Sequence, residues 1–140
     1  MTFDLQLTPE LILQASKVMS SAPDTKIVLC HAGSPADRSE HGLEKWSRDL
    51  RHLSDMDNIF CKLSGLGMFD HNWTENSIAP IVNECLQQFG PSRCMFGSNF
   101  PVDSLYSDYS SLIKAYRKII PKFASETVFD KTARDFYKIH

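Results

Sequence analysis

The sequence predicts an α/β fold with a parallel sheet, because short apolar segments alternate with amphipathic helical segments along its 140 residues. Four apolar segments, at residues 3–7, 26–32, 58–65 and 93–99, end in glycine, proline or polar residues and are interpreted as strands. Helical patterns separate them, so crossover connections join parallel strands. We therefore expect about four βα units in one domain that comprises residues 1–140.

Helical periodicity predicts five helices between and after these strands. Thr8 and Pro9 are expected to begin the first, and Thr74 is expected to cap the third, which ends at Gly90. Ser125 is expected to open the last helix. The apolar stripes that define the five helices are Leu11, Ile12, Ala15, Val18 and Met19; Leu43, Trp46, Leu50 and Leu53; Ile78, Ile81, Val82, Cys85, Leu86 and Phe89; Tyr109, Leu112, Tyr116 and Ile120; and Val128, Phe129, Thr132, Ala133 and Phe136.

The composition of the chain excludes some classes of binding partner and indicates its cellular compartment. With 15 Lys and Arg against 17 Asp and Glu, a net charge of −2 and no basic run, the chain is not expected to bind nucleic acid. It has no apolar run of the roughly 20 residues that a membrane span needs, and no signal-peptide pattern at its start. The four cysteines form no CxxC pair. We expect a cytoplasmic, reduced protein that does not bind membranes.

Polar side chains recur along one face of the predicted strands, as judged from the alternation of residues within each strand. The residues assigned to this face are Asp4, Gln6, His31, Lys62, Ser64, Gly97 and Asn99. Within its own strand, His31 is expected to continue the face of Ile27 and Leu29. Since a parallel sheet is covered on both faces, a recurring polar face indicates an enclosed polar site such as a barrel interior. The alternative is that Asp4 and Lys62 form a structural ion pair and that Ser64 bonds only to backbone.

Three residues at the carboxyl ends of the strands are the candidate catalytic groups. Active sites of parallel α/β folds lie at these ends. His31 directly precedes Ala32 and Gly33, where the strand turns into a loop, and Asn99 and Asp103 follow the last strand. Loops on the same rim carry Arg38 and His71, which we expect to contact a small-molecule substrate. A solvated Arg38 and helix capping around His71 are the alternatives.

Four motifs then suggest a family. They are His31-Ala32-Gly33, Lys62-Leu63-Ser64-Gly65-Leu66, Met95 to Asp103, and Thr132 to Tyr137. In this order and spacing they resemble the C-terminal half of the amidohydrolase-related family, whose members are (β/α)8-barrel hydrolases that include sugar lactonases and the pyrone-dicarboxylate lactonase type. The resemblance implies that the four strands are the fifth to eighth of a TIM barrel. The His-x-His strand with which the family opens is not in this sequence, so we expect a fragment.

The resemblance also implies a reaction, the opening of a lactone or cyclic ester of a sugar or organic acid. Asn99 stands where many relatives have an aspartate, and an amide cannot take up a proton, so Asp103 or His31 is the expected base and Asn99 would orient water or substrate. Substrate contacts are expected from Asp4, Gln6, Arg38, Lys62, Ser64 and His71. One divalent metal ion, Zn²⁺ or Mn²⁺, with His31 as a ligand is one alternative, and a reaction without metal is the other.

Two further alternatives concern the function as a whole. One is a metal-dependent decarboxylase or hydratase of the same superfamily, and the other is an inactive, truncated half-barrel. Strands cut from a barrel leave two sheet edges with unpaired backbone groups, which favour pairing with another chain. We therefore expect either a homodimer or pairing with a complementary half-barrel.

Overall fold

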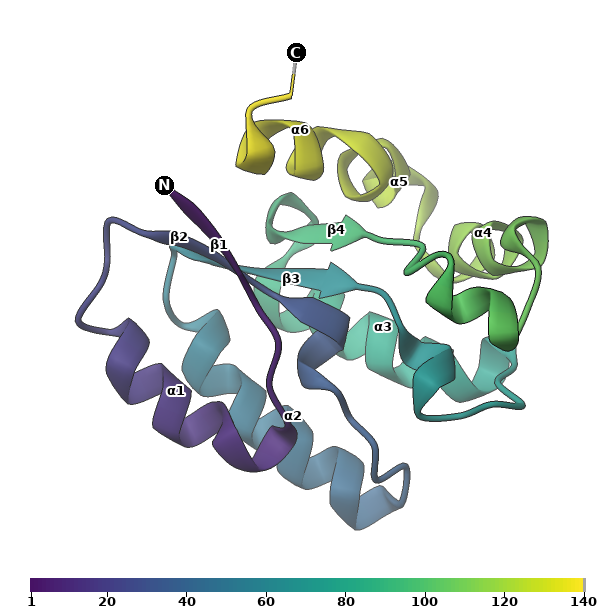
Figure 1. Ribbon diagram of the computed structural model, residues 1–140, viewed down its shortest axis with the longest axis horizontal. Helices are drawn as coiled ribbons and strands as arrows, with labels where there is room; N and C mark the ends of the chain where they lie inside the picture. The colour runs from purple at the N-terminus through teal and green to yellow at the C-terminus, as the bar shows by residue number, and fades with distance from the viewer. Residues whose placement is uncertain (140) are drawn as a thin grey trace.

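The computed structural model describes residues 1–139 and contains one sheet of four parallel strands in the order β1-β2-β3-β4 (Figure 1). The strands are β1 (Thr2–Leu5), β2 (Lys26–Leu29), β3 (Ile59–Leu63) and β4 (Cys94–Phe96). Helical segments separate consecutive strands, and each strand pairs with the next one in the sequence. The predicted α/β fold of about four βα units is confirmed.

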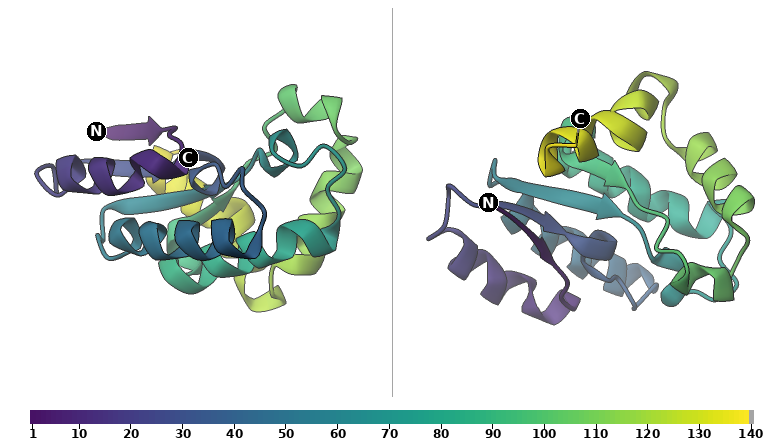
Figure 2. Two further views of the ribbon diagram at one scale, coloured as in Figure 1. Left: turned by 90° about the horizontal axis from the view of Figure 1, so that it is seen from below. Right: turned by 45° about the horizontal axis from the view of Figure 1, so that its top comes forward.

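Helices cover the two faces of the sheet unequally. On one face lie α1 (Ile12–Met19), α2 (Glu40–Ser54) and α3 (Glu75–Phe89), and on the other lie α5 (Lys122–Glu126) and α6 (Thr132–Tyr137) (Figures 1 and 2). The helix α4 (Tyr109–Ile119) lies beyond the carboxyl end of β4, and the π-helical segment η6 (Thr127–Lys131) joins α5 to α6. The short 3-10 segments are η1 (Pro9–Leu11), η2 (Cys30–Gly33), η3 (Leu66–Met68), η4 (Pro91–Arg93) and η5 (Val102–Leu105). No helix of the described residues is long and apolar enough to cross a membrane.

Local sequence signals account for most helix boundaries. The Thr74 side chain accepts a hydrogen bond from the Ser77 backbone N–H, and the Ser77 hydroxyl in turn accepts one from the Thr74 N–H, which confirms the predicted cap of α3. The prediction that Ser125 opens the last helix is wrong, because α5 begins at Lys122 and continues without a break through η6 into α6. In the first helix Ile12 and Met19 are buried as predicted, but Leu11 and Val18 of the predicted apolar stripe are exposed.

The strands end earlier than the sequence predicts, because the chain turns sharply at each carboxyl end. Residues beyond the ends of β2, β3 and β4 adopt positive φ angles, 55° at His31, 63° at Gly65 and 57° at Asn99. These angles lie in the left-handed region and cannot continue a strand. Gln6 likewise follows the end of β1 and is exposed, so strand alternation does not assign it to a face.

The face assigned to β2 must also be corrected. The register places Asp4 beside Val28 and Val28 beside Phe60, so Val28 shares the face of Asp4, whereas Ile27 and Leu29 belong to the core under α1–α3. The prediction that His31 continues the face of Ile27 and Leu29 is wrong, since β2 ends at Leu29 and the left-handed turn redirects the His31 side chain.

We call the face that carries Asp4, Val28, Phe60, Lys62 and Met95 the inner face. It is not polar throughout. Val28 and Met95 form a small apolar cluster with Phe136 of α6, and Phe60 and Tyr137 pack against this cluster. Polar and apolar side chains stand beside one another on this face, because Asp4 pairs with Val28 and Lys62 pairs with Met95.

Candidate active site

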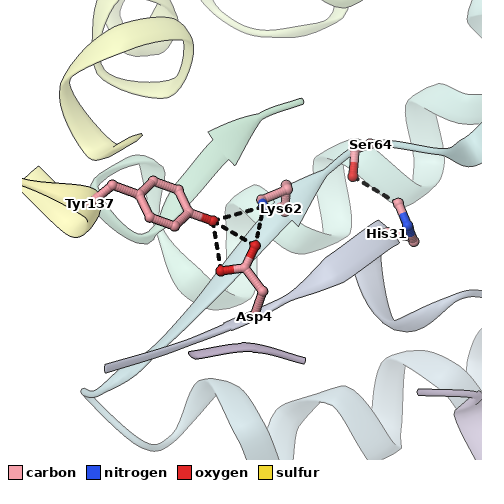
Figure 3. A network of polar contacts seen from close by, with 5 residues as sticks. All are labelled: Asp4, His31, Lys62, Ser64 and Tyr137. Carbon is pink, nitrogen blue, oxygen red and sulfur yellow. Dashed lines mark hydrogen bonds and ion pairs between the residues drawn. The ribbon is translucent and has the colours of Figure 1, made fainter. Parts of the chain in front are cut away.

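The imidazole of His31 and the hydroxyl of Ser64 form a hydrogen-bonded pair just beyond the ends of β2 and β3. Nδ1 of His31 lies 2.9 Å from Oγ of Ser64. Figure 3 draws this bond as a dashed line. Ser64 is buried, whereas His31 is partly accessible. The bond fixes the orientation of the ring and leaves Nε2 as the nitrogen that can meet a substrate or water. The structure therefore brings together two residues that the sequence predicted separately.

Gly65 makes this pair sterically possible. A Cβ atom at position 65 would lie 2.4 Å from Nδ1 of His31, and the φ angle of Gly65 is +63°. Contacts this short do not occur for a real Cβ, and the positive φ itself disfavours residues other than glycine. Glycine is therefore required at position 65 both by the backbone angle and by the close approach of the His31 ring.

Asp103 and Asn99 form a second pair beyond β4. The Asn99 amide Nδ2 donates a hydrogen bond of 2.8 Å to Oδ1 of Asp103. Asp103 is only 1% exposed, and its other oxygen, Oδ2, is buried without a hydrogen-bond partner among the described residues. Buried polar atoms in folded proteins nearly always have partners, so an unpaired carboxylate oxygen at a strand end is typical of a site that binds a further group.

The charges of His31 and Asp103 affect each other's pKa, so the two hydrogen-bonded pairs interact electrostatically. Burial lowers the pKa of His31, while the bond to Ser64 and the charge of Asp103 act in the opposite direction. Burial raises the pKa of Asp103, while the bond from Asn99 and the charge of His31 act against it. Each residue thus lies within electrostatic reach of the other. The net effect on His31 is a lowered pKa, which favours the neutral imidazole that a general base requires.

Asp4 and Lys62 form an ion pair on the inner face, and Tyr137 completes it (Figure 3). The Lys62 ammonium donates to Oδ2 of Asp4 at 2.7 Å and to the Tyr137 hydroxyl at 2.8 Å, and this hydroxyl lies 2.8 Å from both Asp4 oxygens. Burial opposes the charge of Lys62, but its bonds to Asp4 and Tyr137 outweigh burial and raise its pKa. The alternative interpretation of Asp4 and Lys62 as an ion pair therefore matches the geometry.

Sequence reasoning did not assign Tyr137 to the site. It is the last residue of α6 and lies far from the strand ends in sequence, so neither strand alternation nor rim position could identify it. Its only sequence signal is its place in the closing motif from Thr132 to Tyr137.

Arg38 and His71 lie on the rim loops rather than in the pairs described above. Nε of Arg38 donates to the Pro35 carbonyl at 2.6 Å, and Nη2 donates to the Leu66 carbonyl at 3.1 Å. Nη1 is buried and has no partner among the described residues. The exposed ring of His71 stacks on Tyr106 with 4.5 Å between ring centroids. Arg38 thus joins two rim loops, and His71 forms part of their outer surface.

The donors among the described residues do not by themselves form a metal site. Among residues 1–139, no group of three or more His, Cys, Asp or Glu side chains could hold a metal ion. His31 and Asp103 are the two donors at the carboxyl end of the sheet that interact electrostatically. Two donors fall short of the three protein ligands of a catalytic zinc site.

Parallel strands with titratable side chains at their carboxyl ends are characteristic of (β/α)8-barrel enzymes. The family model described as Amidohydrolase matches residues 1–139, and the chain belongs to this family. It is 37% identical to the uncharacterised protein y4mH of Sinorhizobium fredii over 142 residues, which cover 99% of this chain and 48% of y4mH. It is 36% identical to an L-fucono-1,5-lactonase of Burkholderia multivorans over 104 residues, which cover 64% of this chain and 35% of the lactonase.

A solved structure extends this comparison to three dimensions. The chain superimposes with a TM-score of 0.92 and 25% identity on a Burkholderia multivorans amidohydrolase that was crystallised with zinc, over 99% of this chain and 53% of that one. The predicted family is confirmed, as is the prediction that the four strands are half of a TIM barrel. The chain spans about half the length of y4mH and of the zinc-containing amidohydrolase.

Proposed function

We propose that this chain supplies the carboxyl-terminal part of a hydrolase active site that opens a lactone or related cyclic ester of a sugar or organic acid. The observation that carries the proposal is the bond between His31 and Ser64 at the carboxyl end of the sheet, together with the buried carboxylate of Asp103 beyond β4. A neutral imidazole next to a carboxylate is suited to activating water at neutral pH. The similarity to a protein named L-fucono-1,5-lactonase supports this reaction class.

In the proposed reaction His31 acts as general base. In the tautomer that carries its proton on Nδ1, this nitrogen donates to Ser64 and Nε2 accepts a proton from water. The water oxygen then bonds to the ester carbonyl carbon, the carbon–oxygen bond of the ring breaks, and the proton on Nε2 passes to the leaving alkoxide. The charge of Asp103 stabilises the imidazolium between these steps, and Asn99 holds Asp103 in place.

Lys62 is the proposed source of positive charge for an anionic substrate or oxyanion. Its ammonium uses two of its three donors on Asp4 and Tyr137, which leaves one for a ligand. Arg38 shares this proposed role, because its Nη1 is buried without a partner among the described residues. Ser64, Asp4, Gln6 and His71 remain predicted substrate contacts.

A divalent metal ion would require ligands in addition to the side chains of residues 1–139, and none of the steps above depends on one.

The proposed compartment is the reducing cytoplasm, which suits four cysteines that are all free thiols.

The test is a lactonase assay on a completed barrel, made by co-expressing this chain with the part of y4mH that the chain does not cover. Hydrolysis would be followed by proton release in a pH-stat, with sugar-acid 1,5-lactones as substrates and with the corresponding open-chain methyl esters and aromatic carboxylic acids as comparison compounds. We expect lactone turnover well above that of the open-chain esters. Turnover of an aromatic acid with carbon dioxide release, or no turnover by a folded 1:1 complex, would contradict the proposal.

A further inference from the structure

Four consecutive residues beyond β2 turn the chain in the left-handed sense. His31, Ala32, Gly33 and Ser34 have φ angles of 55°, 52°, 73° and 56°. Three of them carry a Cβ atom, which disfavours this region for every residue except glycine. A hydrogen bond of 2.8 Å from the Ser34 backbone N–H to the His31 carbonyl closes the segment. We call residues 31–34 the left-handed turn. Backbone strain of this kind persists only where surrounding contacts impose it.

Trp46 of α2 supplies one of these contacts. Its indole Nε1–H donates a hydrogen bond of 2.8 Å to the Ala32 carbonyl. Both residues are buried, Trp46 at 3% exposed and Ala32 at 0%. Since β2 ends at Leu29, the Ala32 carbonyl lies outside the strand. A buried carbonyl without a partner is costly, and the indole provides that partner. The bond therefore joins α2 to the second residue of the left-handed turn.

The left-handed turn also packs closely against the core. A Cβ atom at Gly33 would lie 3.6 Å from Nε1 of Trp46. It would also lie 3.2 Å from Cδ2 of Leu29 and 3.4 Å from Cδ1 of Ile12, both of which are fully buried. The geometry of the turn thus depends on contacts from α1 and α2 and not on the local preference of its residues.

The direction of the His31 side chain depends on this geometry. His31 is the first residue of the left-handed turn, and Figure 3 draws the bond between its ring and Ser64, with Nδ1 2.9 Å from Oγ. If the turn relaxed to negative φ angles, the Cα–Cβ bond of His31 would change direction. The ring would then leave Ser64, because a hydrogen bond weakens steeply away from its best distance and angle.

We propose that Trp46 is a positioning residue for His31: its hydrogen bond to the Ala32 carbonyl holds the left-handed turn, and the turn holds the imidazole against Ser64. The inference rests on the proposed function, in which His31 is the general base. Trp46 is buried and does not reach a substrate, so its effect on the reaction passes through the orientation of that base.

The first test reads the orientation of His31 without turnover. The full chain, ¹⁵N-labelled at its histidines, is studied by NMR at about pH 8, where an imidazole is neutral. In the wild type the bond to Ser64 should hold His31 in the tautomer that is protonated on Nδ1. In Trp46→Phe, His31 should show the mixture of tautomers of the exposed His41 and His52.

A second form removes only the indole N–H. The chain has two tryptophans, so in the Trp73→Phe background the replacement of tryptophan by benzothienylalanine during expression changes position 46 alone. This analogue keeps the size of the indole and carries sulfur in place of the N–H, so the form should fold even if Trp46→Phe does not. Trp73→Phe with ordinary tryptophan is the matched control. It should keep the wild-type His31 spectrum, because its bond between Trp46 and Ala32 is intact.

The kinetic test uses the completed barrel. Trp46→Phe should lower kcat about 10-fold and change KM less than twofold, because a misplaced base slows the chemical step and leaves substrate binding intact. In the His31→Asn background the same change should alter kcat less than twofold, because no imidazole is left to position.

Two outcomes would overturn the inference. One is an unchanged His31 spectrum in the folded benzothienylalanine form, and the other is an equal effect of Trp46→Phe on kcat with and without His31. The spectrum also separates this inference from the proposed function. A spectrum that changes as expected, in a protein whose completed barrel hydrolyses no lactone, would support the positioning of His31 by Trp46 and contradict the lactonase proposal.

Discussion

The Tyr137 hydroxyl lies 2.8 Å from both carboxylate oxygens of Asp4, so the last helix of the chain is bonded to its first strand. The two residues are 133 positions apart in the sequence, and the segment between them includes β2, β3, β4 and the candidate site. Since the same hydroxyl accepts a bond from Lys62, the C-terminal helix also helps to orient the charge on the inner face.

Replacing Tyr137 with Phe should therefore destabilise the fold. The change removes the bonds to Asp4 and Lys62, and because Asp4 is well exposed to solvent the expected loss is about 1 kcal/mol. Urea unfolding of the completed barrel measures it. Tyr109→Phe is the control, since Tyr109 is 50% exposed on α4, and its expected effect is below about 0.5 kcal/mol. Equal stabilities of the two variants would show that the Tyr137 hydroxyl contributes nothing.

Gly65→Ala should disrupt the His31–Ser64 pair. The new Cβ would overlap Nδ1 of His31, so the ring must move in addition to the backbone strain at positive φ. Gly90→Ala is the control for backbone strain without a new contact, because Gly90 has a φ of 74° and no atom within 4 Å of its added Cβ. Its ψ of 158° places it in a region that is open essentially to glycine alone, whereas Gly65 lies in the left-handed helical region. We expect Gly65→Ala to lose about 1 kcal/mol of stability and Gly90→Ala at least as much, and only Gly65→Ala to lose about 100-fold or more in kcat/KM. Similar activities would exclude a steric role for Gly65 at the site.

His31→Asn should lower kcat by about 100-fold or more with little change in stability, which is the usual effect of removing a general base. This prediction is based on the position of His31 at the strand end and on its bond to Ser64. His52→Asn, on α2, is the control and should leave kcat unchanged. Near-normal turnover by a folded His31→Asn variant would remove His31 from the mechanism.

Asp103→Asn should abolish most activity and yet raise stability at neutral pH. Burial raises the pKa of Asp103 above its ordinary value of 3.8, so the folded state binds a proton more readily than the unfolded state. The charged carboxylate therefore costs stability above its folded pKa, and this cost disappears as pH falls toward 3.8. Melting temperatures measured from pH 3.5 to 8 should show the advantage of Asp103→Asn at pH 7 and its loss in acid. A variant that is less stable than the wild type at pH 7 would indicate that Asp103 binds a structural partner.

The contribution of His31 to stability changes with pH in the opposite direction to that of Asp103. Its pKa lies below the ordinary value of 6.5, so the unfolded state takes up the proton first. Its contribution to stability is present above about pH 6.5 and is lost as the pH falls from there through the folded pKa. The melting temperature of the wild type should therefore fall relative to that of His31→Asn as the pH decreases through this range.

The amino-acid sequence by itself determined the order of strands and helices, the parallel sheet and the family. Local periodicity of apolar residues predicts the strands and helices, and the cap of α3 depends only on Thr74 and Ser77. The positions of His31, Asn99 and Asp103 beyond strand ends follow from the same local pattern, because parallel strands place all their carboxyl ends on one side.

Only the tertiary structure decided which side chains meet. Register determines that Val28, and not Ile27, shares the face of Asp4, and no local pattern specifies register between strands that are joined by helices. Left-handed turns redirect His31 toward Ser64, and the path of α6 brings Tyr137 back to Asp4. These contacts depend on how distant segments pack, because a side chain's partners across the sheet are set by long-range burial and sterics rather than by its neighbours in sequence.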